Sequence, residues 1–209
     1  MLEHANPLVK VTIVPRGRSL GAAWYLPDER SITTTEQILD EMCSALGGRA
    51  AESIVFGKIS TGALSDLEKV TKQAMAMVTI YGLDEKIGNI SYYDSTNQGY
   101  GFTKPYSEET AKIIDQEIKQ IIEKQYERAK NILSKNREKL DLLAEKLLES
   151  EVIFKEDLVK IFGERPFPEK GISLNGTSKE NPKKSKTISE NSSTLKKDVA
   201  PKKSDNAKS

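Results

Sequence analysis

The feature that most constrains this chain is the long stretch from Ser107 to about Glu149, in which apolar residues recur at helical spacing. The recurring positions are Ile114, Ile118, Ile121, Ile122, Tyr126, Ala129 and Leu133, then Leu140, Leu143, Leu147 and Leu148. A break near Asn136 separates the two series, so the stretch predicts two consecutive helices, each with one apolar face. Such faces must be buried against other elements, which favours a mainly α-helical domain.

A small β element is expected at the start of the chain. Residues 8–17, "LVKVTIVPRG", alternate apolar and polar side chains before Pro15 and Gly17, which is typical of a half-buried strand followed by a turn. Residues 21–27, "GAAWYLP", are the expected partner strand, with Trp24 as its anchor. The predicted fold class is therefore mainly α with a small β element.

Four further segments carry shorter helical patterns. The first, residues 33–48, opens with a capping box of Thr33 and Glu36 and is expected to stop at its paired glycines. The others are residues 49–57, 65–82 and 152–166. Residues 88–94 predict a short strand or an extended turn, and residues 94–106, rich in Ser, Asn, Gly, Tyr and Pro, predict a loop.

Composition limits the class of protein. At 209 residues, with 37 % hydrophobic and 30 % charged residues, the chain has room for one domain with a substantial core or for two very small ones. No apolar run approaches about 18 residues, so no transmembrane segment is expected, and the N-terminus lacks the pattern of a secretory signal. The single cysteine, Cys43, excludes an internal disulfide, fits a reducing compartment and is expected to be a small buried hydrophobe.

Charge and composition divide the chain into two parts. Residues 171–209 hold nine Lys and four acidic residues, a balance of +5; because the whole chain carries +1, the first 170 residues carry −4. Aromatic residues are absent beyond Gly171, where Lys, Ser, Asn and Thr dominate. We therefore predict a domain over residues 1–168 and a disordered Lys/Ser-rich tail over residues 169–209. A slightly acidic domain gives no basis for expecting specific nucleic-acid binding.

Asp66 is the carboxylate that most needs an explanation. Near the start of its predicted helix it is favoured by the helix dipole, by about 0.3–1 kcal/mol, and Ser65 with Glu68 also fits a capping box. At about 100° per residue, however, Asp66 shares a helix face with Val70 and Met77, which are expected to be buried. A buried carboxylate without a partner costs several kcal/mol. An inward Asp66 should therefore meet a cation, a metal ion or hydrogen-bond donors.

Three sequence blocks, in this order and at this spacing, give the chain a specific resemblance. They are "KVTIVPRG" at 10–17, "GGRAAE" at 47–52 and "STGALSDLEKVT" at 60–71, and "YGLDEKIGNI" at 81–90 fits the segment that follows. Together they resemble the peptidase domain of FtsH-type membrane-anchored, ATP-dependent zinc proteases, over about residues 2–168. The resemblance implies a helical FtsH-like zinc-peptidase domain in which Asp66 is a zinc ligand. "GGRAAE" is expected to be a packing and turn element without a catalytic role.

Other parts of that catalytic machinery are missing from this sequence. In the family, two histidine ligands and a general-base glutamate lie on an H-E-x-x-H helix. Here that motif does not occur, and the only histidine, His4, is expected to be an ordinary surface residue. The G-x-x-x-x-G-K-[ST] motif is also missing, so ATP is implied only through a separate ATPase module. We expect the chain to begin after the catalytic helix, to hold an incomplete zinc site through Asp66, and to be inactive alone.

The resemblance also implies partners and a location. Longer family members would form a homo-hexamer at the cytoplasmic face of the inner membrane and degrade unfolded or membrane proteins, whereas this fragment would be soluble and cytoplasmic. The strand with Val9, Val11 and Ile13 is expected beside the active site, either as an edge that pairs with an extended substrate or as an ordinary sheet strand. The helices after Ser107 would either contact other subunits or form internal core. Alternatives to the peptidase are a non-catalytic helical oligomerisation module and a gene remnant without function.

Overall fold

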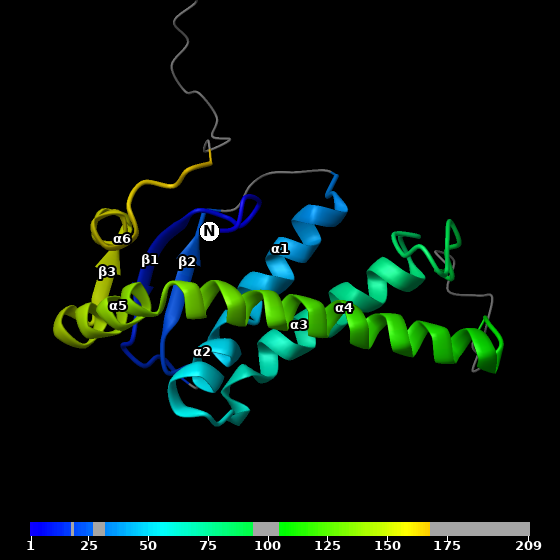
Figure 1. The fold of residues 1–209 in the computed structure, drawn as a ribbon, viewed down its shortest axis with the longest axis horizontal. Helices are drawn as coiled ribbons and strands as arrows, with labels where there is room; N and C mark the ends of the chain where they lie inside the picture. The colour runs from blue at the N-terminus through cyan, green and yellow to red at the C-terminus, as the bar shows by residue number, and fades with distance from the viewer. Residues whose placement is uncertain (18, 27–31, 94–104, 168–209) are drawn as a thin grey trace, which may run out of the picture. The chain divides into compact units, whose positions relative to one another are not determined.

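The chain is mainly helical in the part that the computed structural model describes, residues 1–17, 19–26, 32–93 and 105–167 (Figure 1). The α-helices are α1 (Thr35–Ala45), α2 (Gly47–Phe56), α3 (Leu64–Thr79), α4 (Glu108–Lys135), α5 (Arg137–Ser150) and α6 (Lys155–Phe162), and a 3-10 turn, η1 (Thr61–Ala63), precedes α3. The strands are β1 (Leu8–Thr12), β2 (Ala22–Tyr25) and β3 (Val152–Phe154). The predicted mainly α fold with a small β element is confirmed.

Two predicted segments fall largely outside the described residues. The tail predicted over 169–209 lies outside them entirely, and so does most of the loop predicted over 94–106. Within the described ranges, no helix is both long enough and apolar enough to cross a membrane. Residues 88–93 contain no strand; instead the Tyr92 N–H donates a hydrogen bond of 2.8 Å to the carbonyl of Thr79, which holds this extended segment against the end of α3.

The apolar stripe of α4 forms internal core. Its Ala111, Ile114 and Ala129 are buried, and the helix packs on α1, α2 and α3. The opposing residues include Met42 and Leu46, both almost fully buried. Of the two alternatives for this stripe, core is the one observed. By contrast, α5 has no fully buried residue among those described, because it packs mainly against α6 and β3 at the edge of the domain.

The helix boundaries follow local chemistry, with one correction at α1. Asn136 separates α4 from α5, as predicted, and Gly57 ends α2 in the left-handed region at φ 63°. The capping box at α1 is formed by Thr34 and Gln37, not by Thr33 and Glu36. The Thr34 N–H donates to the Gln37 side chain at 2.8 Å, and Thr34 Oγ1 accepts from the Gln37 N–H at 3.4 Å. The prediction was one residue early because three consecutive threonines can each serve as the cap.

The paired glycines do not separate two helices as expected. Helix α1 ends at Ala45, and Leu46 is both the C-cap of α1 and the N-cap of α2. Gly47 and Gly48 are the first residues of α2. The turn between the helices is therefore made without a left-handed residue, because Leu46 keeps a right-handed conformation at φ −75° and ψ −5°.

The sheet has the order β2-β1-β3, and both pairings are antiparallel. Strand β1, which contains Val9 and Val11, is central in the described sheet and is hydrogen-bonded on both sides, and Ile13 follows its last residue. Of the two alternatives for this segment, the arrangement favours an ordinary sheet strand. Strand β3 corrects a further prediction, because the segment from Val152 was expected to be a short helix stopped by Gly163 and Pro166, and its first three residues form a strand instead. Ile153 is fully buried opposite Val11, and the pairing with β1 outweighs the helical pattern that follows.

Trp24 does not anchor β2 in the core. All four residues of β2 are exposed, and Trp24 itself is 36 % exposed. The Lys10 Nζ lies 4.4 Å from the centroid of the Trp24 ring, across the β1–β2 pair. Trp24 is therefore held by a cation–π contact on the sheet surface instead of by burial.

Cys43 is 2 % exposed, which confirms the predicted buried hydrophobe. Burial raises the pKa of its thiol above the ordinary value of 9.0. The native thiol is therefore protonated and inaccessible at pH 8, and we expect an aromatic disulfide reagent to modify it at least about a hundredfold more slowly than in the unfolded chain. Comparing absorbance kinetics with and without guanidinium checks this. Equal rates in the two solvents would contradict the burial.

Candidate metal centre

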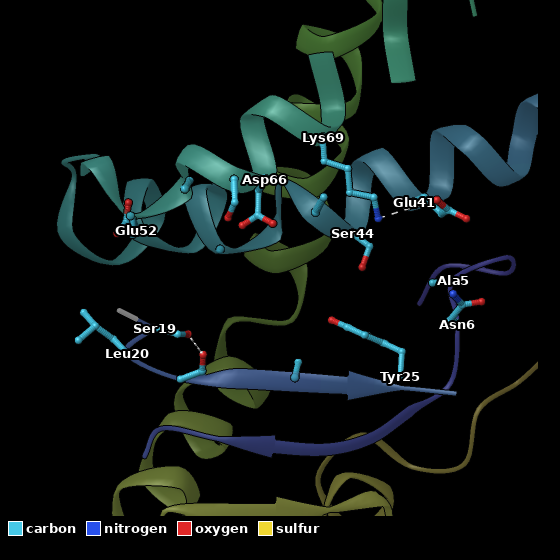
Figure 2. A pocket seen from close by; sticks show the side chains of 17 residues that line it. Ala5, Asn6, Ser19, Leu20, Tyr25, Glu41, Ser44, Glu52, Asp66 and Lys69 are labelled. Atoms are coloured by element: carbon cyan, nitrogen blue, oxygen red, sulfur yellow. Dashed lines mark hydrogen bonds and ion pairs between the residues drawn. The ribbon is translucent and has the colours of Figure 1, made fainter. Parts of the chain in front are cut away.

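A cavity of about 920 Å³ lies between strand β2 and the helical layer (Figure 2). Its walls come from the segment before β1, from β2, from α1 and α2, and from the start of α3. Gly21 lines the cavity where the chain enters β2, and a Cβ atom there would lie 2.7 Å from the backbone oxygen of Thr12. Only glycine fits at this position, so it allows the start of β2 to lie close to the end of β1 along the border of the cavity.

Asp66 lies in the first turn of α3 and points into this cavity (Figure 2). It is half-buried, at the margin of the helix face on which Val70 and Met77 are buried, as the helical spacing predicts. The capping box suggested for Ser65 and Glu68 is not formed, because α3 is preceded by η1 and its cap residue makes no side-chain hydrogen bond. Asp66 still occupies a position that the helix dipole favours.

The Asp66 carboxylate has no hydrogen-bond donor or cation paired with it in the described part of the chain. The nearby Lys69 instead lies with its Nζ 3.9 Å from a carboxylate oxygen of Glu41. A half-buried carboxylate normally gains such partners, because solvation alone compensates it only in part. The acid is therefore free to accept a ligand that enters the cavity.

Tyr25 is the residue of this site that sequence analysis missed. It projects from β2 into the cavity, toward the side where Ser44 lies (Figure 2). Tyr25 is 49 % exposed, and the partial burial of its side chain, followed by the negative charge of Asp66, raises its pKa above the ordinary value of 10.0. The phenol consequently keeps its proton at neutral pH. The only available signal was an aromatic residue on a predicted strand, and that does not say which way the side chain points.

Glu52 of the "GGRAAE" block ties α2 to the turn that precedes α3. Its carboxylate accepts a hydrogen bond of 2.6 Å from the Ser60 hydroxyl and one of 3.0 Å from the Ser60 N–H, and these bonds lower the pKa of Glu52. The side chain also lines the cavity. This arrangement agrees with the expected packing and turn role, because both carboxylate oxygens are engaged with Ser60, one with its backbone N–H and one with its hydroxyl, just before the turn that leads to Asp66.

The described residues do not complete a metal site by themselves. His4 is half-buried, and its backbone N–H donates to Asp40 at 2.8 Å. Across the described ranges, no group of three or more His, Cys, Asp or Glu side chains is gathered closely enough to hold a metal ion. Asp66 nevertheless fits the role of a single zinc ligand, since it is an accessible carboxylate without a competing partner.

Comparison with known proteins gives the family of this chain. The model of peptidase family M41 matches residues 1–161. An ATP-dependent zinc metalloprotease FtsH of Parabacteroides distasonis is 61 % identical over 188 residues, which cover 87 % of this chain and 28 % of the relative. An FtsH of Karelsulcia muelleri is 56 % identical, covering 77 % of this chain and 26 % of the relative. The mitochondrial inner membrane m-AAA protease component AFG3L1 of Mus musculus is 47 % identical, covering 81 % and 21 %.

The chain thus spans roughly a quarter of the length of the curated relatives it matches. The match nevertheless covers most of the described residues, from the N-terminal segment to α6. It includes β2 and the helices that form the cavity around Asp66. This chain therefore belongs to peptidase family M41, as a peptidase-domain fragment of the FtsH-like zinc metalloproteases.

Proposed function

We propose that this chain is part of a zinc-dependent peptidase site in an ATP-dependent protease, and that Asp66 is one of the zinc ligands. The observation that carries the proposal is the unpaired Asp66 carboxylate, which points into a cavity in a chain of family M41. Two histidine ligands and the general-base glutamate would come from an H-E-x-x-H helix outside this sequence. On that basis the chain alone is inactive.

Within such a site, the residues of this chain supply charge, position and a proton donor. Zinc, when bound, lowers the pKa of a coordinated water to about 7 and so provides hydroxide near neutral pH. Asp66 contributes an oxygen ligand and a negative charge that partly offsets the charge of the ion. The Tyr25 hydroxyl keeps its proton and faces the same cavity, where it is a hydrogen-bond donor for a peptide carbonyl.

The substrate edge is assigned to β2. Strand β2 is an outer strand of the described sheet, its residues are exposed, and it borders the cavity beside Asp66 (Figure 2). An extended peptide can add to such an edge through main-chain hydrogen bonds, largely without regard to its sequence. That mode of binding suits an enzyme that degrades many unfolded or membrane-derived proteins.

The wider setting belongs to the same proposal. A separate ATPase module would supply the ATP dependence, and the protease would work as a homo-hexamer at the cytoplasmic face of the inner membrane. Leu142 and Leu148 on α5 are exposed, so this helix offers apolar surface for contact with another subunit. In the alternative function, a non-catalytic oligomerisation module, the same surface of α5 would form the contact between subunits.

The test compares this 209-residue chain with an extended chain, in which an H-E-x-x-H helix of the family precedes residue 1. We expect the extended chain to hold about one zinc ion and to cleave unfolded casein in a chelator-sensitive way. The 209-residue chain should do neither. Zinc content is measured by metal analysis and cleavage by release of labelled peptides. Zinc-dependent cleavage by the shorter chain, or a metal-free extended chain, would disprove the proposal.

A further inference from the structure

We propose that Arg165 and Asp40 are positioning residues that hold residues 2–5 by their backbone and so fix one wall of the Asp66 cavity. This inference rests on the proposed function, because it assigns that wall to the peptidase site. Neither residue lines the cavity itself. Their role would be to set where the N-terminal segment lies relative to Asp66.

Arg165 binds this segment through three backbone carbonyls. Its Nη2 donates to the carbonyl of Ala5 at 2.7 Å, to that of Glu3 at 2.8 Å and to that of Leu2 at 3.3 Å. A guanidinium is a cationic donor, and charge-assisted hydrogen bonds are stronger than neutral ones. Because every acceptor is a main-chain oxygen, the contact fixes the path of the segment irrespective of its side chains.

Asp40 binds the same segment through the backbone of His4. One carboxylate oxygen accepts the His4 N–H at 2.8 Å, and the other lies 2.7 Å from a guanidinium nitrogen of Arg128. The Asp40 side chain is 4 % exposed, so these partners compensate for the solvation that the buried carboxylate loses. Asp40 lies on α1 and Arg128 on α4, so the ion pair links these two helices. Through the Asp40 carboxylate, the N-terminal segment is held in a fixed position against both helices.

The held segment leads directly into the cavity wall. Ala5 and Asn6 line the cavity on the side of Glu41 and Tyr25 (Figure 2). The next residue, Pro7, accepts a hydrogen bond of 2.9 Å from the Leu26 N–H, just past the end of β2. A shift of residues 2–5 would therefore move both this side wall of the cavity and the end of the proposed substrate edge.

Backbone exchange in the 209-residue chain tests the attachment. In Arg165→Ala we expect the amides of His4 and Leu26 to exchange at least about fivefold faster, while the core amides of α4 keep their rates. Arg165→Lys retains the charge and should give intermediate rates. Asp40→Asn, which removes the charge but keeps the shape, should also accelerate exchange at His4. Arg137→Ala is the matched control, because Arg137 also donates to a backbone carbonyl, that of Ile54, without touching this segment.

Casein cleavage by the extended chain tests the positioning role. Arg165→Ala should lower kcat about tenfold with KM nearly unchanged, since small displacements of a reacting geometry are costly. Unchanged exchange at His4 and Leu26 overturns the attachment. Uniform acceleration over the whole chain also overturns it, because Arg165 would then contribute only to the stability of the whole domain. Faster local exchange with unchanged kcat overturns the positioning role. If the unsubstituted extended chain cleaves nothing, the proposed function fails together with the positioning role, while exchange still decides the attachment.

Discussion

Asp66→Asn in the extended chain is expected to weaken zinc binding by more than about a hundredfold and to abolish casein cleavage. Loss of a partner that only orients a metal ligand already costs 10–100-fold in affinity, and loss of the ligand itself should cost more. Asn keeps the size of the side chain but removes the negative charge that the ion requires. A competition titration with a zinc-chelating dye measures the affinity.

The same variant separates the zinc role of Asp66 from the helix-dipole role. If the carboxylate only complemented the dipole, Asp66→Asn would cost about 0.3–1 kcal/mol of stability and leave zinc binding intact. Glu68→Gln is a suitable control, because Glu68 is exposed on the same helix and pairs with Lys72. An Asp66→Asn protein that binds zinc and cleaves casein as well as the Glu68→Gln protein would end the assignment.

Met42→Ala is expected to lower the free energy of unfolding by about 2–5 kcal/mol. Met42 lies on α1 in the cluster that α3 and α4 complete, and it is 0 % exposed, so truncation leaves a cavity that the surrounding helices fill only in part. That loss is a large share of the 5–15 kcal/mol typical of a whole domain. Urea unfolding followed by circular dichroism measures it, since the signal comes mostly from the helices.

Met75→Ala is the matched control for this prediction. Met75 lies on α3 but is 50 % exposed, so the same substitution removes little buried surface, and we expect a change within about 0.5 kcal/mol. Equal losses for the two variants would show that the α1–α3–α4 cluster is not the stabilising core. A large loss for Met42→Ala alone would support it.

The helices of this protein were predictable because their signals are local. The apolar spacing between Ser107 and Glu149, and the break at Asn136, identify α4 and α5 without reference to any other segment. The same 3.6-residue period places Asp66 on the side of α3 that carries Val70 and Met77. Helical periodicity says nothing about metal binding; the expectation of zinc came from the resemblance of the three sequence blocks.

Only the tertiary structure decided the sheet and the surroundings of Asp66. Strand β3 exists because it pairs with β1, and Thr12 Oγ1 donates to the carbonyl of Glu151, 139 residues away. The same pairing made β1 central and left β2, with Tyr25, along the cavity. Arg165 likewise meets residues that are 160 or more positions distant. A periodic pattern reports which side of an element is buried, but not which distant segment buries it, and contacts of that range determined this site.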